Sequence, residues 1–266
     1  MSFPLTALSR DVLRLRGPDT TSLLQGLLTA NMDTLHDGPL FGALLTPQGK
    51  IVETMFLTPI GEDLYIDVSA GRGSAFARKL MLYRLRAKVE IEEVSISVGV
   101  APDDSDVPED VLTSAPDPRH PDLCIRFLTE GSGGLPETEQ LYLIHQAALG
   151  VPDMHAGFGE AEVFPLDVNL DVLHGIDHKK GCFVGQEVAS RMFRKGEIRK
   201  RTYIALGADV VPDTPLKQND RTVGEIRHTQ GDVALAMVRL DRLDDDSDSA
   251  EADGQTVTLI KPDYLP

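Results

Sequence analysis

The chain has 266 residues, with 26 Lys or Arg against 42 Asp or Glu, and therefore a formal net charge of -16. This length suggests one large domain or two to three small ones, and a hydrophobic content of 41% excludes wholesale disorder. No stretch approaches about 18 consecutive apolar residues, which excludes a membrane-spanning helix, and so acidic a chain makes sequence-independent nucleic-acid binding a poor default. Residues 1–10 lack the basic, apolar and small-residue blocks of a signal peptide, so we expect a cytoplasmic protein.

The first hundred residues predict a mixture of strands and helices. In chain order we expect a strand at 12–16, a helix whose apolar face holds Leu23, Leu24, Leu27 and Leu28, a hairpin of 41–46 with 51–58, a strand at 64–68, a helix over 73–83, and strands at 88–94 and 95–100. Strands and helices that do not alternate regularly favour an α+β fold over a doubly wound sheet.

The remaining elements are separated by acidic segments. Segments 101–122 and 241–253 each hold seven acidic residues, and we interpret both as exposed loops. Between them we expect a strand at 123–128 and a helix over 137–149, and after residue 199 strands at 201–206, 222–229, 233–239 and 255–260, which indicate a small β-barrel or sandwich. The predicted division is 1–100 and 101–198, both α+β, and 199–266, a β-barrel.

The most informative segment surrounds Cys182, one of only two cysteines in the chain. A helix is predicted after Gly185, and Lys179 and Lys180 precede the cysteine. A helix N-terminus and neighbouring cations both favour a thiolate, so we interpret Cys182 as a candidate reactive thiol. The alternative is that Cys182 is a small buried apolar residue at the start of a helix. A metal site made with His174 and His178 is disfavoured, because Gly175 and the Lys-Lys-Gly sequence break the helix that would align the three residues.

The octapeptide Lys180-Gly181-Cys182-Phe183-Val184-Gly185-Gln186-Glu187 resembles the Lys-Gly-Cys-Tyr-x-Gly-Gln-Glu signature of the YgfZ-like folate-binding proteins. These are paralogues of the glycine-cleavage T-protein, an aminomethyltransferase, and act in iron–sulfur protein maturation. Segments 15–31, 44–50, 83–89 and 165–171 are also similar to this family. The chain departs from the pattern with Asp167 for Glu or Gln, Phe183 for Tyr, and Thr54 where an Asp is frequent.

The resemblance implies a T-protein-like fold of three parts around a central hole that binds tetrahydrofolate or a derivative. Carboxylate and amide side chains suit the edge of a pterin, and cations suit the glutamate tail. The implied cofactor-binding residues are Asp167, Asn169, Gln186 and Glu187 for the pterin, Arg84, Arg86, Lys180 and Arg191 for the tail, and Gly181 and Gly185 for close approach of the backbone. No resident metal is expected.

We therefore expect a folate-binding accessory protein that helps assemble or repair iron–sulfur client proteins, with Cys182 as the reactive group. One alternative is a tetrahydrofolate-dependent aminomethyl or methyl transferase. Another is a tRNA-binding factor in tRNA modification that uses the eight basic residues of segment 179–201.

Overall fold

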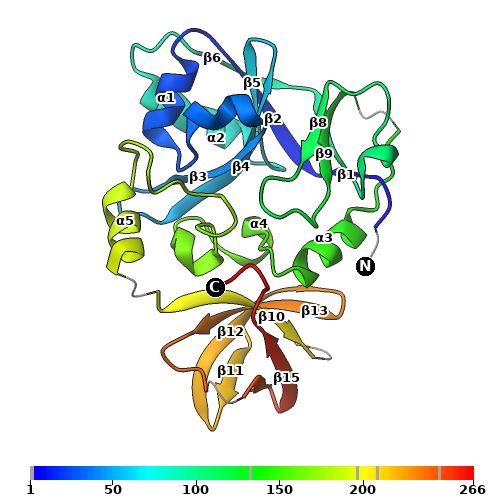
Figure 1. Ribbon diagram of the computed structural model, residues 1–266, viewed down its shortest axis with the longest axis vertical. Helices are drawn as coiled ribbons and strands as arrows, with labels where there is room; N and C mark the ends of the chain where they lie inside the picture. Colours follow the sequence, from blue (N-terminus) through cyan, green and yellow to red (C-terminus); the bar gives the residue numbers. More distant parts are fainter. Residues whose placement is uncertain (1–2, 132–133, 196–197, 208–209, 245–246) are drawn as a thin grey trace.

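The computed structural model describes residues 3–131, 134–195, 198–207, 210–244 and 247–266. Its N-terminal half contains two antiparallel sheets (Figure 1). The five-stranded sheet has the order β3-β4-β5-β2-β6, and its strands are β2 (Arg10–Arg16), β3 (Leu40–Leu45), β4 (Ile51–Ile60), β5 (Asp63–Ser69) and β6 (Glu90–Val94). These strands agree with those predicted, and the 41–46/51–58 hairpin is confirmed as the β3–β4 pair.

The second sheet has four strands in the order β1-β7-β9-β8. They are β1 (Thr6–Leu8), β7 (Ile96–Ala101), β8 (Thr113–Pro116) and β9 (Ile125–Glu130). Two of them come from the first hundred residues and two from beyond. The division at residue 100 therefore stays a prediction, and this sheet spans it.

Helices α1 (Thr20–Leu27) and α2 (Gly73–Arg84) cover one face of the five-stranded sheet, as the apolar stripes predict. Strand alternation sends residues of β3 and β4 to opposite sides. Leu44, Met55 and Leu57 pack under the two helices, whereas Phe41 and Phe56 join a separate core on the opposite face. This second face points toward the middle of the molecule.

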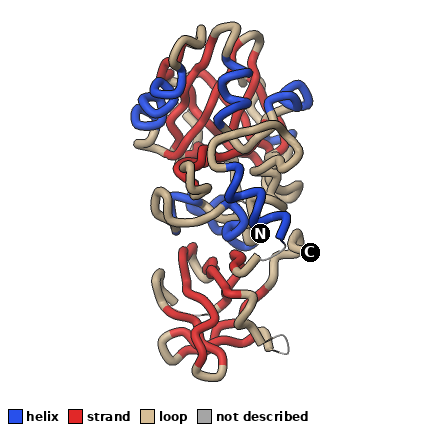
Figure 2. The backbone as a smooth tube through the Cα atoms, turned by 90° about the vertical axis from the view of Figure 1, so that its left-hand side faces the viewer, coloured by secondary structure: helices blue, strands red, loops and turns tan. Residues whose placement is uncertain are grey.

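The barrel prediction is confirmed, because the C-terminal strands close into a six-stranded barrel with the order β10-β13-β12-β11-β14-β15. The strands are β10 (Lys200–Leu206), β11 (Pro215–Gln218), β12 (Arg221–Gln230), β13 (Val233–Arg239), β14 (Ser249–Ala252) and β15 (Gln255–Ile260). The barrel lies below the sheets in Figures 1 and 2, and helix α3 (Glu139–Ala148) contacts both β1 and the barrel strands β12 and β13. The α+β fold class is therefore confirmed.

The remaining helices are short. They are η1 (Met32–Asp37), η2 (Asp104–Asp106), α4 (Met154–Gly157), η3 (Pro165–Val168) and α5 (Gln186–Lys195). Helix α5 agrees with the helix predicted after Gly185. In the part of the chain that the structure describes, no helix is long and apolar enough to cross a bilayer.

The interpretation of the two acidic segments as exposed loops is wrong in part. Segment 101–122 contains the strand β8, and its Asp117 and Arg119 are buried as an ion pair. Segment 241–253 contains β14, in which Ala250 and Ala252 are buried and their neighbours are exposed. In both segments the high proportion of acidic residues concealed a short strand.

Asn169 and Asp171 join the central part of the chain to the barrel. The Asn169 side chain is fully buried, and its amide donates to the Thr202 carbonyl at 2.8 Å and to the Tyr264 hydroxyl at 3.1 Å. Asp171 accepts two hydrogen bonds from the Arg201 guanidinium, at 2.5 and 2.8 Å. The barrel is therefore held by buried polar contacts as well as by apolar packing.

We expect Asn169→Ala to lower the free energy of unfolding by about 2–4 kcal/mol, because it leaves buried acceptors on the barrel without a donor. Urea denaturation followed by circular dichroism measures this loss. Asn219→Ala is the matched control. Both asparagines have a positive φ, 62° for Asn169 and 48° for Asn219, but Asn219 is exposed. Equal losses for both variants would contradict the assigned role of Asn169.

Candidate functional site

A cavity of about 330 Å³ lies where the five-stranded sheet, the four-stranded sheet and α3 meet. Its lining comes from the ends of β1, β2 and β5, from β3, β4 and β9, from the loop between β8 and β9, from α3 and the loop after it, and from α4. The lining residues are Leu8, Ser9, Arg10, Phe41, Thr54, Phe56, Ser69, Ala70, Arg119, Arg126, Glu139, Tyr142, Leu143, Gln146, Pro152, Asp153, Met154 and Ala156. This cavity is the candidate for the central hole that the family resemblance implies.

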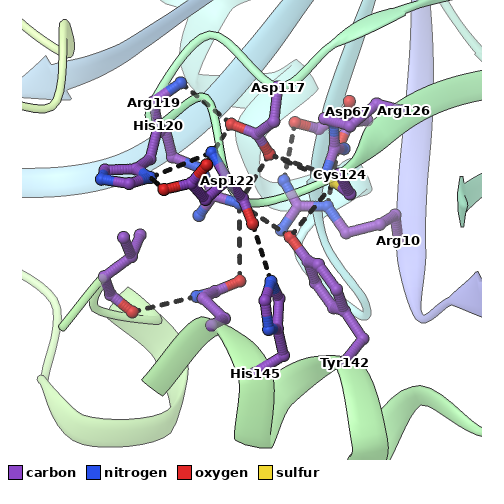
Figure 3. Close-up of polar contacts among 12 residues, drawn as sticks. Arg10, Asp67, Asp117, Arg119, His120, Asp122, Cys124, Arg126, Tyr142 and His145 are labelled. Carbon is purple, nitrogen blue, oxygen red and sulfur yellow. Dashed lines mark hydrogen bonds and ion pairs between the residues drawn. The ribbon is translucent and has the colours of Figure 1, made fainter. Parts of the chain in front are cut away.

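Three arginines line the cavity, and two aspartates behind them hold their guanidinium groups (Figure 3). Asp67 accepts from Arg10 Nε at 2.7 Å and from Arg126 Nη2 at 2.9 Å. Asp117 accepts from Arg119 Nε at 3.0 Å and from Arg119 Nη2 at 2.8 Å. Both aspartates are only 3% exposed and neither lines the cavity. The positive groups therefore form part of the cavity wall, and the carboxylates that neutralise them are set back from it.

The buried carboxylate of Asp117 is held ionised by this arrangement. Burial alone would raise its pKa, but the charge and hydrogen bonds of Arg119, with the charge of Arg126, outweigh burial and hold the pKa below its usual range. The same pairing keeps the pKa of Arg119 above its ordinary value despite burial. Asp117 and Arg119 are thus both charged at neutral pH.

Phe56 provides an aromatic surface for the same arginines. The Arg126 guanidinium lies 3.6 Å from the centre of the Phe56 ring and the Arg119 guanidinium 4.8 Å from it. Phe41 packs against Phe56 with 5.0 Å between ring centres. Cation–π contact of this kind fixes the planes of the guanidinium groups before any ligand arrives.

Cys124 lies behind the cavity wall, and its thiol is unreactive in the folded protein. It is buried, and its sulfur lies 3.9 Å from both the Tyr142 hydroxyl and an Asp117 carboxylate oxygen. Burial, with the nearby Asp117 charge, raises the pKa of the Cys124 thiol to about 12. Arg119 Nη2 also donates to the Tyr142 hydroxyl at 2.9 Å, so the phenol is held at the cavity wall.

Cys182 is exposed and lies in a loop that is anchored on both sides. The buried Lys180 ammonium donates to the Leu28 and Ala30 carbonyls, both at 2.6 Å, and burial lowers its pKa to about 8. After the cysteine, Gly185 adopts φ = 81°, and a Cβ there would lie 2.5 Å from the Thr46 carbonyl oxygen. Lys180 is thus committed to backbone carbonyls, and α5 begins at Gln186.

The structure places the ten predicted cofactor-binding residues in three separate regions, none of which lines the cavity. Asp167 and Asn169 lie at the barrel junction, where Asp167 accepts from the Phe164 backbone N–H and burial raises its pKa. Arg84 donates to the Val89 carbonyl at the end of α2, close in sequence to the exposed Arg86. The third region holds Lys180, Gly181, Gly185, Gln186, Glu187 and Arg191, of which Glu187 and Arg191 are exposed. Their role in cofactor binding stays a prediction.

The cavity arginines were missed by sequence reasoning, although the sequence carries a signal for two members of the network. Asp67 is the one charged residue in the apolar stretch 64–68, and Arg126 is the one charged residue in 123–128. A charge at an inward position of a buried strand needs an opposite partner. Two such strands with opposite charges therefore indicate an ion pair between sheets, and the structure contains it.

The fold defines the class of protein first. The chain is similar to the crystal structure of glycine cleavage system aminomethyltransferase T from Bartonella henselae, with a TM-score of 0.73 and 12% identity, over 98% of this chain and 86% of that one. Residues 199–266 match the family described as the CAF17 C-terminal beta-barrel domain. The protein thus has the T-protein-like fold with a CAF17-type barrel.

Its relatives are named as iron–sulfur cluster assembly factors. The IBA57 homolog of Pyricularia oryzae is 29% identical over 89% of this chain and 72% of its own length. Human IBA57 is 28% identical over 97% of this chain and 83% of its own length. Matches to four further relatives span 51–54% of their length. The chain is similar to the IBA57 factors, as the YgfZ-like resemblance predicts. The expectation of a cytoplasmic protein is contradicted, because these relatives are named as mitochondrial and point to mitochondria instead.

We expect a thiol reagent such as DTNB at pH 8 to modify one of the two cysteines rapidly in the native protein. Cys182 is exposed, whereas with a pKa of about 12 roughly one ten-thousandth of the buried Cys124 is thiolate at that pH. The fast phase is lost in Cys182→Ser, and Cys124 reacts after unfolding in urea. Two rapidly reacting thiols in the native protein, or a fast phase that survives in Cys182→Ser, would contradict this assignment.

Proposed function

We propose that the protein is a folate-binding accessory factor in the assembly or repair of iron–sulfur cluster proteins. The observation that carries the proposal is the central cavity with its wall of three guanidinium groups, in a chain similar to the IBA57 iron–sulfur cluster assembly factors. The accessory role follows the names of those relatives. The ligand class follows the resemblance to the folate-binding family, and the cations of the cavity wall support an anionic ligand.

A reduced folate fits the groups that line the cavity. Its glutamate tail carries carboxylates, which suit the positive charges of Arg10, Arg119 and Arg126. The ring system of a folate carries amide and amine groups, for which Gln146 and the Glu139 carboxylate are available on α3. A bound folate would supply a carrier for one-carbon units, and this chain would bind and orient it.

Cys182 would act outside the cavity, because it is exposed and does not line it. Within the described residues no group of three or more His, Cys, Asp or Glu is placed to hold a metal ion. Iron–sulfur clusters are held by several thiolates. We therefore propose that Cys182 contributes one thiolate, or accepts one transferred group, while a client or assembly protein supplies the other ligands.

The two alternatives receive less support. A transferase needs a carboxylate against the reacting nitrogen. Asp167 and Glu187, the two carboxylates that the resemblance implies for the pterin, do not line the cavity, although Glu139 and Asp153 do. A tRNA-binding surface on 179–201 loses two of its eight cations, because Lys180 and Arg201 are buried in internal contacts. The accessory role is therefore the function we propose.

We expect Arg10→Gln to weaken tetrahydrofolate binding by about tenfold or more, because a charged hydrogen bond to the ligand is lost while Arg126 still pairs with Asp67. Isothermal titration calorimetry under anaerobic conditions measures the affinity. Arg14→Gln is the matched control on the same strand, since Arg14 pairs with the exposed Glu92 and does not line the cavity. Equal affinities for wild type and Arg10→Gln would contradict the cavity as the folate site.

We expect Cys182→Ala to lower the activity of iron–sulfur client enzymes in cells, because the exposed thiol is removed. The activity and the cluster content of iron–sulfur enzymes, in cells that depend on this chain, measure the effect. The purified variant should bind tetrahydrofolate as wild type does, because Cys182 lies outside the cavity lining. Full client activity in the Cys182→Ala cells would contradict the proposed role of the Cys182 thiol, but it would not contradict the cavity as the folate site.

A further inference from the structure

Helix α2 has two apolar faces, and only one of them is covered. Phe76, Ala77 and Leu80 are buried against the five-stranded sheet. At the C-terminal end of the helix, Met81, Leu82 and Leu85 are 46%, 77% and 86% exposed. A helix that is apolar on both sides is normally buried on both sides. We call Met81, Leu82 and Leu85 the α2 patch.

Cations surround the α2 patch. Segment 73–89 contains five Lys or Arg and no Asp or Glu, in a chain whose net charge is -16. Lys79 pairs with Glu160, and Arg84 donates to the Val89 carbonyl. The remaining cations, Arg78, Arg86 and Lys88, are exposed, and their side chains form no ion pair with any residue in the described ranges. An apolar centre with a charged rim is the usual composition of a protein interface.

Leu85 is held in a strained backbone conformation. It directly follows α2 and has φ = 47° and ψ = -106°, a region that non-glycine residues avoid. Glycine is the usual residue at such helix ends. Because the Leu85 side chain is 86% exposed, packing within this chain does not offset the strain. Packing within the described part of the chain therefore does not explain a leucine at this position.

We propose that the α2 patch is a docking surface for an acidic partner protein. Leu82 and Leu85 would pack against the apolar face of a helix on the partner, and Asp and Glu side chains beside that face would pair with Arg78, Arg86 and Lys88. Three residues are enough for the centre of a protein interface but too few for a whole one, so the surrounding charged residues would supply the rest of the contact. This surface is separate from the cavity and from Cys182.

A protein partner fits these observations better than an anionic membrane. Carboxylates at fixed positions on a partner helix can each pair with one of the exposed cations, whereas a fluid lipid surface offers them no fixed positions. The exposed apolar side chains of the patch include none of the Trp or Tyr residues that anchor proteins at membrane interfaces. The net charge of -16 also opposes approach to an anionic bilayer, but a partner with a small acidic surface meets only the local cations.

The test uses a labelled synthetic helical peptide of about 18 residues, with Leu along one face and Glu at the other positions. Fluorescence anisotropy measures its binding to the full chain. We expect saturable binding that weakens with salt and that falls at least about tenfold in Leu82→Ser and in Leu85→Gly. Leu141→Ser is the matched control, because Leu141 is a 48% exposed helical leucine on α3, and it should leave binding unchanged.

Leu85→Gly separates docking from structure. Glycine accepts the positive φ without strain, so the melting temperature of this variant should be equal to or higher than that of wild type while peptide binding falls. The proposal is overturned if the Glu peptide does not bind the wild-type chain, if a matched Lys peptide binds as well, or if Leu85→Gly binds normally. Binding to phosphatidylglycerol vesicles, but not to the peptide, would assign the patch to a membrane instead.

Discussion

The ion network of Asp67, Asp117 and the three cavity arginines is the contact on which the rest of the N-terminal half depends. Asp67 belongs to the five-stranded sheet, and it accepts from Arg10 of that sheet and from Arg126 of the four-stranded sheet. A buried carboxylate is tolerable only when opposite charges and hydrogen bonds compensate for lost water. The two sheets are therefore joined by these charges as well as by the apolar cluster of Val12, Val98 and Leu128, and the cavity lies where the sheets meet.

The octapeptide around Cys182 contributes no residue to the cavity lining and has a separate structural role. Lys180 and Gly185 fix the loop onto the C-terminal end of α1 and onto the β3–β4 turn. The segment that identifies the family thus builds a support for one exposed thiol. The residues that shape the cavity are dispersed over several strands and α3, and no short motif contains them.

The sequence was sufficient for most of the architecture, because period-2 and period-3.6 patterns report directly which side of an element is buried. It was insufficient for β1, β8, β11 and β14, which have only three or four residues each. For the site, the sequence left open whether Cys182 is a reactive thiol or a buried apolar residue, and the structure shows it exposed. The Arg–Asp network was not predicted, because its members are brought together by the pairing and packing of sheets. The inward direction of the Lys180 charge was not predicted either, because spacing alone does not reveal it.

The ends of the two open sheets show how this chain avoids uncontrolled self-association. The barrel is closed and offers no free edge, and the outer strand β3 is bridged by Leu28. Strand β6 carries three glutamates in five residues, β8 has four residues and ends at Pro116, and β1 bonds to the Pro136 carbonyl. Charge, brevity and proline all discourage another chain from adding a strand. Intermolecular contacts of this protein are therefore directed to side chains, and amyloid-type growth from its sheets is disfavoured.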